Sequence, residues 1–137
     1  MEPHTEKQNE ATYNRPEGSR KLDAPVVRIN LPDYLRQLKD ENAWQNTSRN
    51  AITVLHNEHM RIVLIALKEG QEMSHAIDGA LCIQVLDGRL WIETEAQSFS
   101  VDTEEMAALQ PRLQHYIVAE EESVFLLTLS GNYGGEF

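Results

Sequence analysis

The side chains of this chain best suited to chemistry are its five histidines and its single cysteine. His75 and His115 lie in β-rich sequence, so neighbouring strands could bring their rings together. Two imidazoles alone make a weak metal site, because structural zinc normally has four protein ligands and catalytic zinc has three. Asp78 could complete a set of two histidines and one carboxylate, which holds iron(II) with open positions. The competing interpretation is a pair of pocket histidines that bond to water or to a ligand.

The remaining histidines and the cysteine give weaker signals. His56 and His59 flank a predicted hairpin turn and could chelate a metal only if the turn brought both rings together. The single cysteine, Cys82, excludes an internal disulfide and a thiolate zinc cluster. Because Cys82 alternates with Leu81, we expect a buried, inert thiol that faces away from the pocket.

The net charge of −10 limits the classes of partner. Residues 1–49 carry equal numbers of basic and acidic side chains, so the whole net charge lies in residues 50–137. Such a surface repels phosphate, which predicts no binding to nucleic acid. The longest apolar run, residues 62–67, is too short to span a membrane. With one cysteine and no signal-peptide pattern, we expect a cytoplasmic protein.

Apolar residues recur with period two from residue 50 onward, which predicts short strands in an antiparallel sandwich or barrel. The Asp87-Gly88 pair between two apolar strands predicts a hairpin, because glycine accepts a positive φ. The predicted strands are residues 51–56, 61–67, 71–75, 81–86, 90–94, 98–101, 106–109, 113–119 and 123–129.

The residues outside the barrel differ in composition and predict three further regions, two before the barrel and one after it. Residues 1–21 are polar and predict a disordered leader. Residues 22–49 form an extension in which 26–29 could add a short strand, and 31–39 predict a short helix from apolar residues spaced i, i+3, i+4, i+7. Residues 50–130 would form the barrel, and residues 131–137 an irregular tail.

Alternation along the strands predicts which side chains face the barrel interior. If His75 points inward, Ile77, Leu81 and Ile83 share its side. Trp91 would then lie on the outer, otherwise polar face, where we expect a contact with a second copy in a homodimer. The predicted interior lining is Ile62, Leu64, Ile77, Leu81, Ile83, Leu90 and Ile92, with the two histidines near the mouth.

Four stretches carry a resemblance to a known family. They are LKEG at residues 67–70, His75, VLDG at 85–88 and PRLQH at 111–115. With them, residues 51–130 resemble a small single-domain cupin of the RmlC-like superfamily, of the uncharacterised bacterial type with an incomplete metal-ligand set. The resemblance implies an all-β fold, the cupin double-stranded β-helix or jelly-roll barrel, preceded here by the short helix and the leader.

The resemblance also implies which ligand positions are kept and which are lost. His75 matches the first histidine of the first cupin motif, and His115 matches the histidine of the second. Ile77 and Leu81 occupy the places of the other two ligands and cannot bind a metal. Leu113 stands where the second motif usually has a glycine.

The sequence predicts a small-molecule-binding cupin with an apolar pocket formed by His75, Ile77, Leu81, Ile83 and His115. It leaves open whether the protein is an enzyme and needs no cofactor for this interpretation. The alternative is a metal-dependent oxygenase or isomerase that uses His75, His115 and Asp78 with a divalent transition metal (Fe, Zn, Mn or Ni). A second alternative is a structural dimerisation module. In each case we expect a homodimer.

Overall fold

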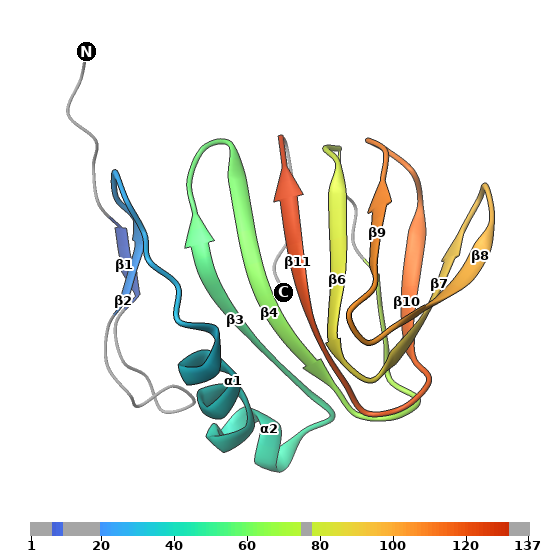
Figure 1. Cartoon of the computed structure of the whole chain (residues 1–137), viewed down its shortest axis with the longest axis horizontal. Coiled ribbons are helices and arrows are strands. Elements are labelled where there is room, and N and C mark those ends of the chain that lie inside the picture. Colours follow the sequence, from blue (N-terminus) through green and yellow to red (C-terminus); the bar gives the residue numbers. More distant parts are fainter. Residues whose placement is uncertain (1–6, 10–19, 75–77, 132–137) are drawn as a thin grey trace.

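The computed structural model describes residues 7–9, 20–74 and 78–131. Its main body consists of two antiparallel sheets that curl toward each other (Figure 1). The five-stranded sheet has the order β3-β4-β11-β6-β9, and the four-stranded sheet has the order β5-β10-β7-β8. Its strands are β3 (Arg49–His56), β4 (Met60–Leu67), β5 (Glu72–Ser74), β6 (Leu81–Asp87), β7 (Arg89–Thr94), β8 (Ser98–Asp102), β9 (Met106–Leu109), β10 (His115–Ala119) and β11 (Ser123–Ser130).

All nine strands predicted from residue 50 onward are present, with ends that differ from the prediction by at most two residues. Their inward side chains form one apolar cluster between the sheets. Leu81 and Ile83 on β6 and Leu90 and Ile92 on β7 belong to this cluster, as alternation predicted. The all-β double-layer architecture is therefore confirmed.

The predicted facing of β4 was wrong. Ile62 and Leu64 point to the outer face, while Val63, Ile65 and Leu67 enter the interior cluster. The two helices cover this part of the sheet, so β4 is apolar on both faces. Alternation cannot distinguish the two faces of a strand that is buried on both sides.

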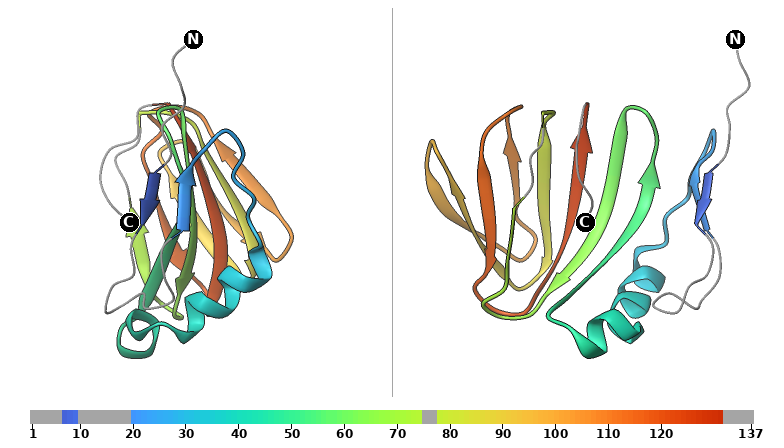
Figure 2. Two further views of the ribbon diagram at one scale, coloured as in Figure 1. Left: turned by 90° about the vertical axis from the view of Figure 1, so that its left-hand side faces the viewer. Right: turned by 180° about the vertical axis from the view of Figure 1, so that it is seen from behind.

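The helices α1 (Leu31–Asp40) and α2 (Asn42–Asn46) pack on the outer side of β3 and β4 (Figures 1 and 2). Asn30 caps α1, since its side-chain oxygen accepts a hydrogen bond from the backbone N–H of Asp33 at 3.3 Å. The helices and the sheet share a second apolar cluster, in which Leu38 and Trp44 are buried. The predicted stripe of α1 thus serves packing; the short α2 was not predicted.

The Asp87-Gly88 pair does not form a hairpin, because β6 and β7 belong to different sheets. Gly88 has the expected positive φ, +99°, but here it turns a corner between the two layers. A Cβ atom at Gly88 would lie 2.3 Å from Oγ of Ser123. Glycine is thus required by both the backbone angle and the close approach of β11.

The extension before the helices also differs from the prediction. Residues 26–29 form no strand. Two short strands lie earlier, β1 (Lys7–Asn9) within the predicted leader and β2 (Arg20–Asp23), and they pair with each other antiparallel. None of the helices in the described residues is both long and apolar enough to cross a membrane.

Candidate functional site

His115 is the predicted site residue whose surroundings the structure describes most fully. It begins β10, where His115, Ile117 and Ala119 alternate inward, and only 9% of its surface is exposed. Its Nδ1 lies 3.2 Å from the carbonyl oxygen of Leu113. Its Nε2 is buried and has no hydrogen-bond partner among the described residues. A buried polar atom without a partner is uncommon in folded proteins and needs a physical explanation.

The turn before His115 forms without the glycine usual in the second cupin motif. Arg112 adopts the left-handed conformation, with φ +63°, one position before the residue where the glycine was expected. Leu113 is thus free to pack against the interior cluster. The same turn places the Leu113 carbonyl beside the imidazole of His115.

Two of the predicted pocket residues, His75 and Ile77, lie outside the described residues. Convergence of His75 on His115 therefore stays a prediction. Leu81 and Ile83 are packed among the interior side chains, and neither lines the polar pocket at the start of β10. Asp78 lies in the loop before β6 and is exposed.

The described residues do not assemble a metal-ligand set by themselves. No group of three or more His, Cys, Asp or Glu side chains within them is arranged to hold a metal ion. Of the predicted donors, His115 faces inward and Asp78 is exposed to solvent. A metal centre here would need His75 as well.

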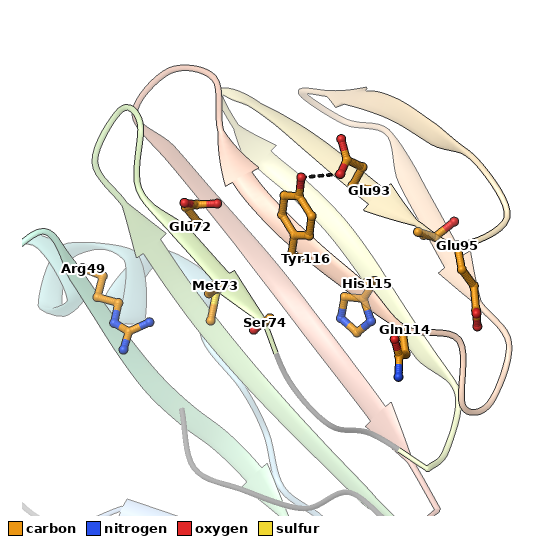
Figure 3. Close-up of a pocket in the computed structure, with 10 residues that line it drawn as sticks. Arg49, Glu72, Met73, Ser74, Glu93, Glu95, Gln114, His115 and Tyr116 are labelled. Atoms are coloured by element: carbon orange, nitrogen blue, oxygen red, sulfur yellow. Dashed lines mark hydrogen bonds between the residues drawn. The ribbon is translucent and has the colours of Figure 1, made fainter.

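A pocket of about 760 Å³ opens over the four-stranded sheet and around the start of β10 (Figure 3). Its walls are mostly polar, unlike the apolar pocket predicted from the sequence. It is lined by Arg49, Glu72, Met73, Ser74, Glu93, Thr94, Glu95, Gln114, His115 and Tyr116. We call it the β10 pocket.

Strand register explains how these side chains come together. Tyr116 on β10 lies directly opposite Ser74 on β5 and Glu93 on β7. The next outward row contains Val118, with Glu72 on one side and Trp91 on the other. Side chains directly opposite each other in such pairs have Cβ atoms about 5 Å apart, so they form a continuous wall.

A smaller hollow of about 210 Å³ adjoins this wall. It shares Arg49 and Met73 with the β10 pocket and is also lined by Asn50, Ala51 and Ile65. Ile65 belongs to the interior cluster, and Ala51 packs against it. The gap between β3 and β5 therefore leads from the polar pocket toward the barrel interior.

The hydroxyl of Tyr116 donates a hydrogen bond to Glu93 (Figure 3). This bond is the main cause that raises the pKa of Tyr116, followed by burial and by the charges of Glu93 and Glu72. The indole N–H of Trp91 reaches the other carboxylate oxygen of Glu93 at 3.4 Å. Both aromatic side chains thus help to hold the Glu93 carboxylate in place.

The charged groups at the two ends of the pocket remain available. The carboxylates of Glu72 and Glu95 make no ion pair or side-chain hydrogen bond in the described part of the chain, and neither does the guanidinium of Arg49. Arg49 lies on the β3 side of the pocket, across Met73 from Tyr116 (Figure 3). The pocket therefore has an acidic region over β5, β10 and β7 and a basic group at its edge.

The other candidate side chains lie away from this pocket. His56 and His59 flank the β3–β4 turn as predicted; there the Asn57 side chain accepts hydrogen bonds from the backbone N–H groups of His59 and Met60. Cys82 faces the side opposite Leu81 and is half-buried, and burial raises the pKa of its thiol. A raised pKa leaves less thiolate near neutral pH, which agrees with an inert cysteine.

Sequence reasoning missed Glu72, Glu93 and Tyr116 as pocket residues. Their alternation with buried neighbours showed that they point outward. It did not show that β5, β10 and β7 are adjacent, because the hydrogen bonds between these strands join segments far apart in sequence.

Comparisons with known proteins identify the fold and no more. No family model matches the chain, and no curated protein matches it. Among solved structures, a conserved protein of unknown function from Streptococcus pyogenes is 17% identical with a TM-score of 0.64, and the match covers 81% of this chain and 93% of that one.

Two further solved structures share this fold. An RmlC-like cupin with a double-stranded β-helix fold from Methanocaldococcus jannaschii is 14% identical, with a TM-score of 0.56 and coverage of 63% and 84%. A salicylate 1,2-dioxygenase from Pseudoaminobacter salicylatoxidans is also 14% identical, with a TM-score of 0.64; the match covers 88% of this chain but 35% of the dioxygenase. This chain therefore has the double-stranded β-helix fold of the cupin superfamily.

Proposed function

We propose that this protein binds a small polar molecule in the β10 pocket, with His115 as a direct contact. The observation that carries the proposal is the buried Nε2 atom of His115, which has no hydrogen-bond partner in the described part of the chain. Leaving such an atom unsatisfied costs about 1–3 kcal/mol. A bound ligand that completes this hydrogen bond would recover that free energy.

The contact between Nδ1 and Leu113 indicates what the ligand must offer. A carbonyl oxygen only accepts hydrogen bonds, so Nδ1 must carry the proton that it shares with Leu113. In the neutral imidazole, Nε2 is then an acceptor with a free lone pair. The proposed ligand therefore presents an O–H or N–H group to His115.

A thermal-shift screen of metabolites tests this proposal. We expect at least one polar compound to raise the melting temperature of the wild-type protein and to lose this effect in His115→Ala. His59→Ala is the matched control, because His59 is exposed in the β3–β4 turn, away from the pocket. A compound that stabilises His115→Ala as strongly as the wild type would refute His115 as the contact.

A metal-dependent cupin enzyme is the second candidate function. The lone pair of Nε2 that could accept a ligand's hydrogen bond could equally bind a metal, and one structural neighbour is a dioxygenase. This candidate uses His75, His115 and Asp78 as donors. Elemental analysis of protein purified without chelator or nickel resin should then find a stoichiometric transition metal that is lost in the His75→Ala/His115→Ala double variant. Unchanged metal content in that variant would eliminate this candidate.

A further inference from the structure

We infer that the ligand of the β10 pocket is a small hydroxy acid, whose carboxylate pairs with Arg49 and whose hydroxyl donates a hydrogen bond to Nε2 of His115. This inference rests on the proposed function and names the chemical class of the ligand. It depends on which face of the sheets each lining side chain occupies.

His115 faces the barrel interior, on the side of β10 opposite Tyr116. His115 and Ile117 alternate along β10, and Ile117 belongs to the interior apolar cluster. The exposed Tyr116 between them points to the outer face. Thr94 of β7 is directly opposite His115 and shares the inner face. The buried Nε2 of His115, without a partner among the described residues, is thus open to a ligand in the inner part of the pocket.

Arg49 occupies the inner face as well, at the start of β3. It lies directly opposite Leu67 of β4, and Leu67 is a member of the interior cluster. Ala51, two residues later on β3, also packs against this cluster. The register of β3 on β4 is regular from Arg49 to Thr53, so the alternation of faces holds over this stretch. The guanidinium of Arg49 is therefore on the same side of the barrel wall as His115.

The charges of the pocket separate by face. Glu72 alternates with the buried Met73, and Glu93 alternates with the buried Ile92, so both carboxylates lie on the outer face. Of the described strand residues that line the inner part of the pocket, Arg49 alone carries a full charge. The sheet stands between this part and the outer carboxylates. An anionic group of the ligand is therefore favoured beside Arg49, although the outer face is acidic.

An apolar surface joins the two polar contacts. Met73 lies between Arg49 and His115 (Figure 3), and it lines both the β10 pocket and the smaller hollow beside it. Arg49 also lines both spaces, and Ala51 and Ile65 form the interior side of the hollow. A short carbon chain would pack on Met73 while its two ends meet the polar side chains.

The two polar side chains require different groups from the ligand. The guanidinium of Arg49 is always protonated and matches the planar geometry of a carboxylate. Nδ1 of His115 shares its proton with Leu113, so Nε2 accepts a hydrogen bond. A hydroxyl suits this acceptor better than an ammonium group, because burying a charge beside a neutral imidazole costs more free energy. A molecule with a carboxylate at one end and a hydroxyl at the other satisfies both.

Hydroxy acids of increasing length test the ligand class by calorimetry at low salt. The series consists of glycolate, 3-hydroxypropanoate, 4-hydroxybutanoate, 5-hydroxypentanoate and 6-hydroxyhexanoate. We expect one length to bind best, because Arg49 and His115 are on strands at a set separation. The diol of that length lacks the carboxylate and should bind about two- to fivefold more weakly. The O-methyl ether of the same acid lacks the donor and should bind at least about fivefold more weakly, because Nε2 is left without a partner.

The variant Arg49→Gln locates the carboxylate. It should weaken the best hydroxy acid about two- to fivefold, in the range of a partly exposed ion pair, and leave the affinity for the uncharged diol unchanged. Arg36→Gln is the matched control, because Arg36 is exposed on α1, which packs on the outer side of β3 and β4. Glu72→Gln is a second control from the outer face of the pocket. Neither control should weaken the binding of the hydroxy acid.

The outcomes separate this inference from the proposed function. If no hydroxy acid of the series binds, or if Arg49→Gln binds the best one as tightly as the wild type does, the inference is overturned, and the thermal-shift screen with His115→Ala still decides the proposed function. If the diol binds as tightly as the hydroxy acid and loses affinity in His115→Ala, the carboxylate is wrong but His115 still contacts the ligand. Binding that survives His115→Ala unchanged would contradict both. Loss of hydroxy-acid binding in Arg49→Gln and in His115→Ala would support both.

Discussion

Replacing Gly88 with alanine should destabilise the protein strongly, because this residue turns the corner between the two sheets. Gly88 has φ +99°, a conformation that disfavours any residue with a Cβ atom by about 1–2 kcal/mol. The new Cβ would also lie 2.3 Å from Oγ of Ser123 and 2.5 Å from the backbone oxygen of Glu122. Relieving such overlap in a packed region costs typically about 1–3 kcal/mol.

The backbone oxygen of Glu122 cannot rotate away as a flexible side chain could. Oγ of Ser123 is likewise held, because it accepts a hydrogen bond from the N–H of Arg89 at 3.0 Å. The two effects together predict a loss of about 2–5 kcal/mol for Gly88→Ala, a large part of the stability of an average domain.

Gly70→Ala separates the two contributions. Gly70 also has a positive φ, +84°, but nothing lies within 4 Å of a Cβ built there. Its alanine variant should therefore lose only the conformational part, about 1–2 kcal/mol. Urea denaturation of both variants, followed by circular dichroism, measures the difference. Equal losses of unfolding free energy would refute the close approach of β11 to this corner.

Two other predictions concern the outer face of the four-stranded sheet. Trp91→Glu should convert the expected homodimer into a monomer, because it places a charge at the proposed contact between the two copies. Light scattering measures the mass in solution. A variant that is still a dimer would show that Trp91 is not in the interface. Tyr116→Phe should reduce the loss of stability above about pH 10. The pKa of Tyr116 is raised in the folded state, mainly by its hydrogen bond to Glu93. The protonated Tyr116 side chain therefore contributes to the free energy of unfolding below the pKa of the unfolded state, and this contribution is lost as the pH rises through the pKa of the folded state. An identical alkaline denaturation profile for Tyr116→Phe and the wild type would contradict that contribution.

The strands could be predicted from the sequence because each has a local pattern. The alternation in β6, where Leu81, Ile83 and Val85 are buried and the residues between them are less so, is visible in the sequence alone. The helix α1 also has local signals, its apolar spacing and the cap at Asn30. These signals involve residues within one or two turns of one another, so no knowledge of distant contacts is needed.

The errors occurred where distant contacts decide the structure. Ile62 and Leu64 point to the outer face, which the helices cover. The sequence of the strand does not show that helices pack on this face. Gly88 has the backbone of a tight turn, but whether the chain stays in one sheet or crosses to the other depends on the pairing of β6 and β7 with other strands.

The candidate site was predictable in part for the same reason. The inward direction of His115 agrees with its match to the histidine of the second cupin motif, and His115 alternates with its neighbours in β10. The acidic wall around Tyr116 could not be predicted, because it exists only when β5 and β7 pair with β10 on opposite sides. The lack of a hydrogen-bond partner for Nε2 of His115 could not be predicted either, since its role as an acceptor depends on the contact between Nδ1 and the carbonyl oxygen of Leu113.

The nitrogen-15 chemical shifts of the His115 imidazole test the central claim most directly. For neutral His115, a long-range proton–nitrogen NMR spectrum should show the proton on Nδ1 and a bare Nε2, whose resonance moves when a compound that stabilises the protein in the thermal-shift screen is added. His59 serves as an internal reference that should not respond. A proton on Nε2 in the free protein, or an Nε2 resonance unchanged at saturating ligand, would contradict the account.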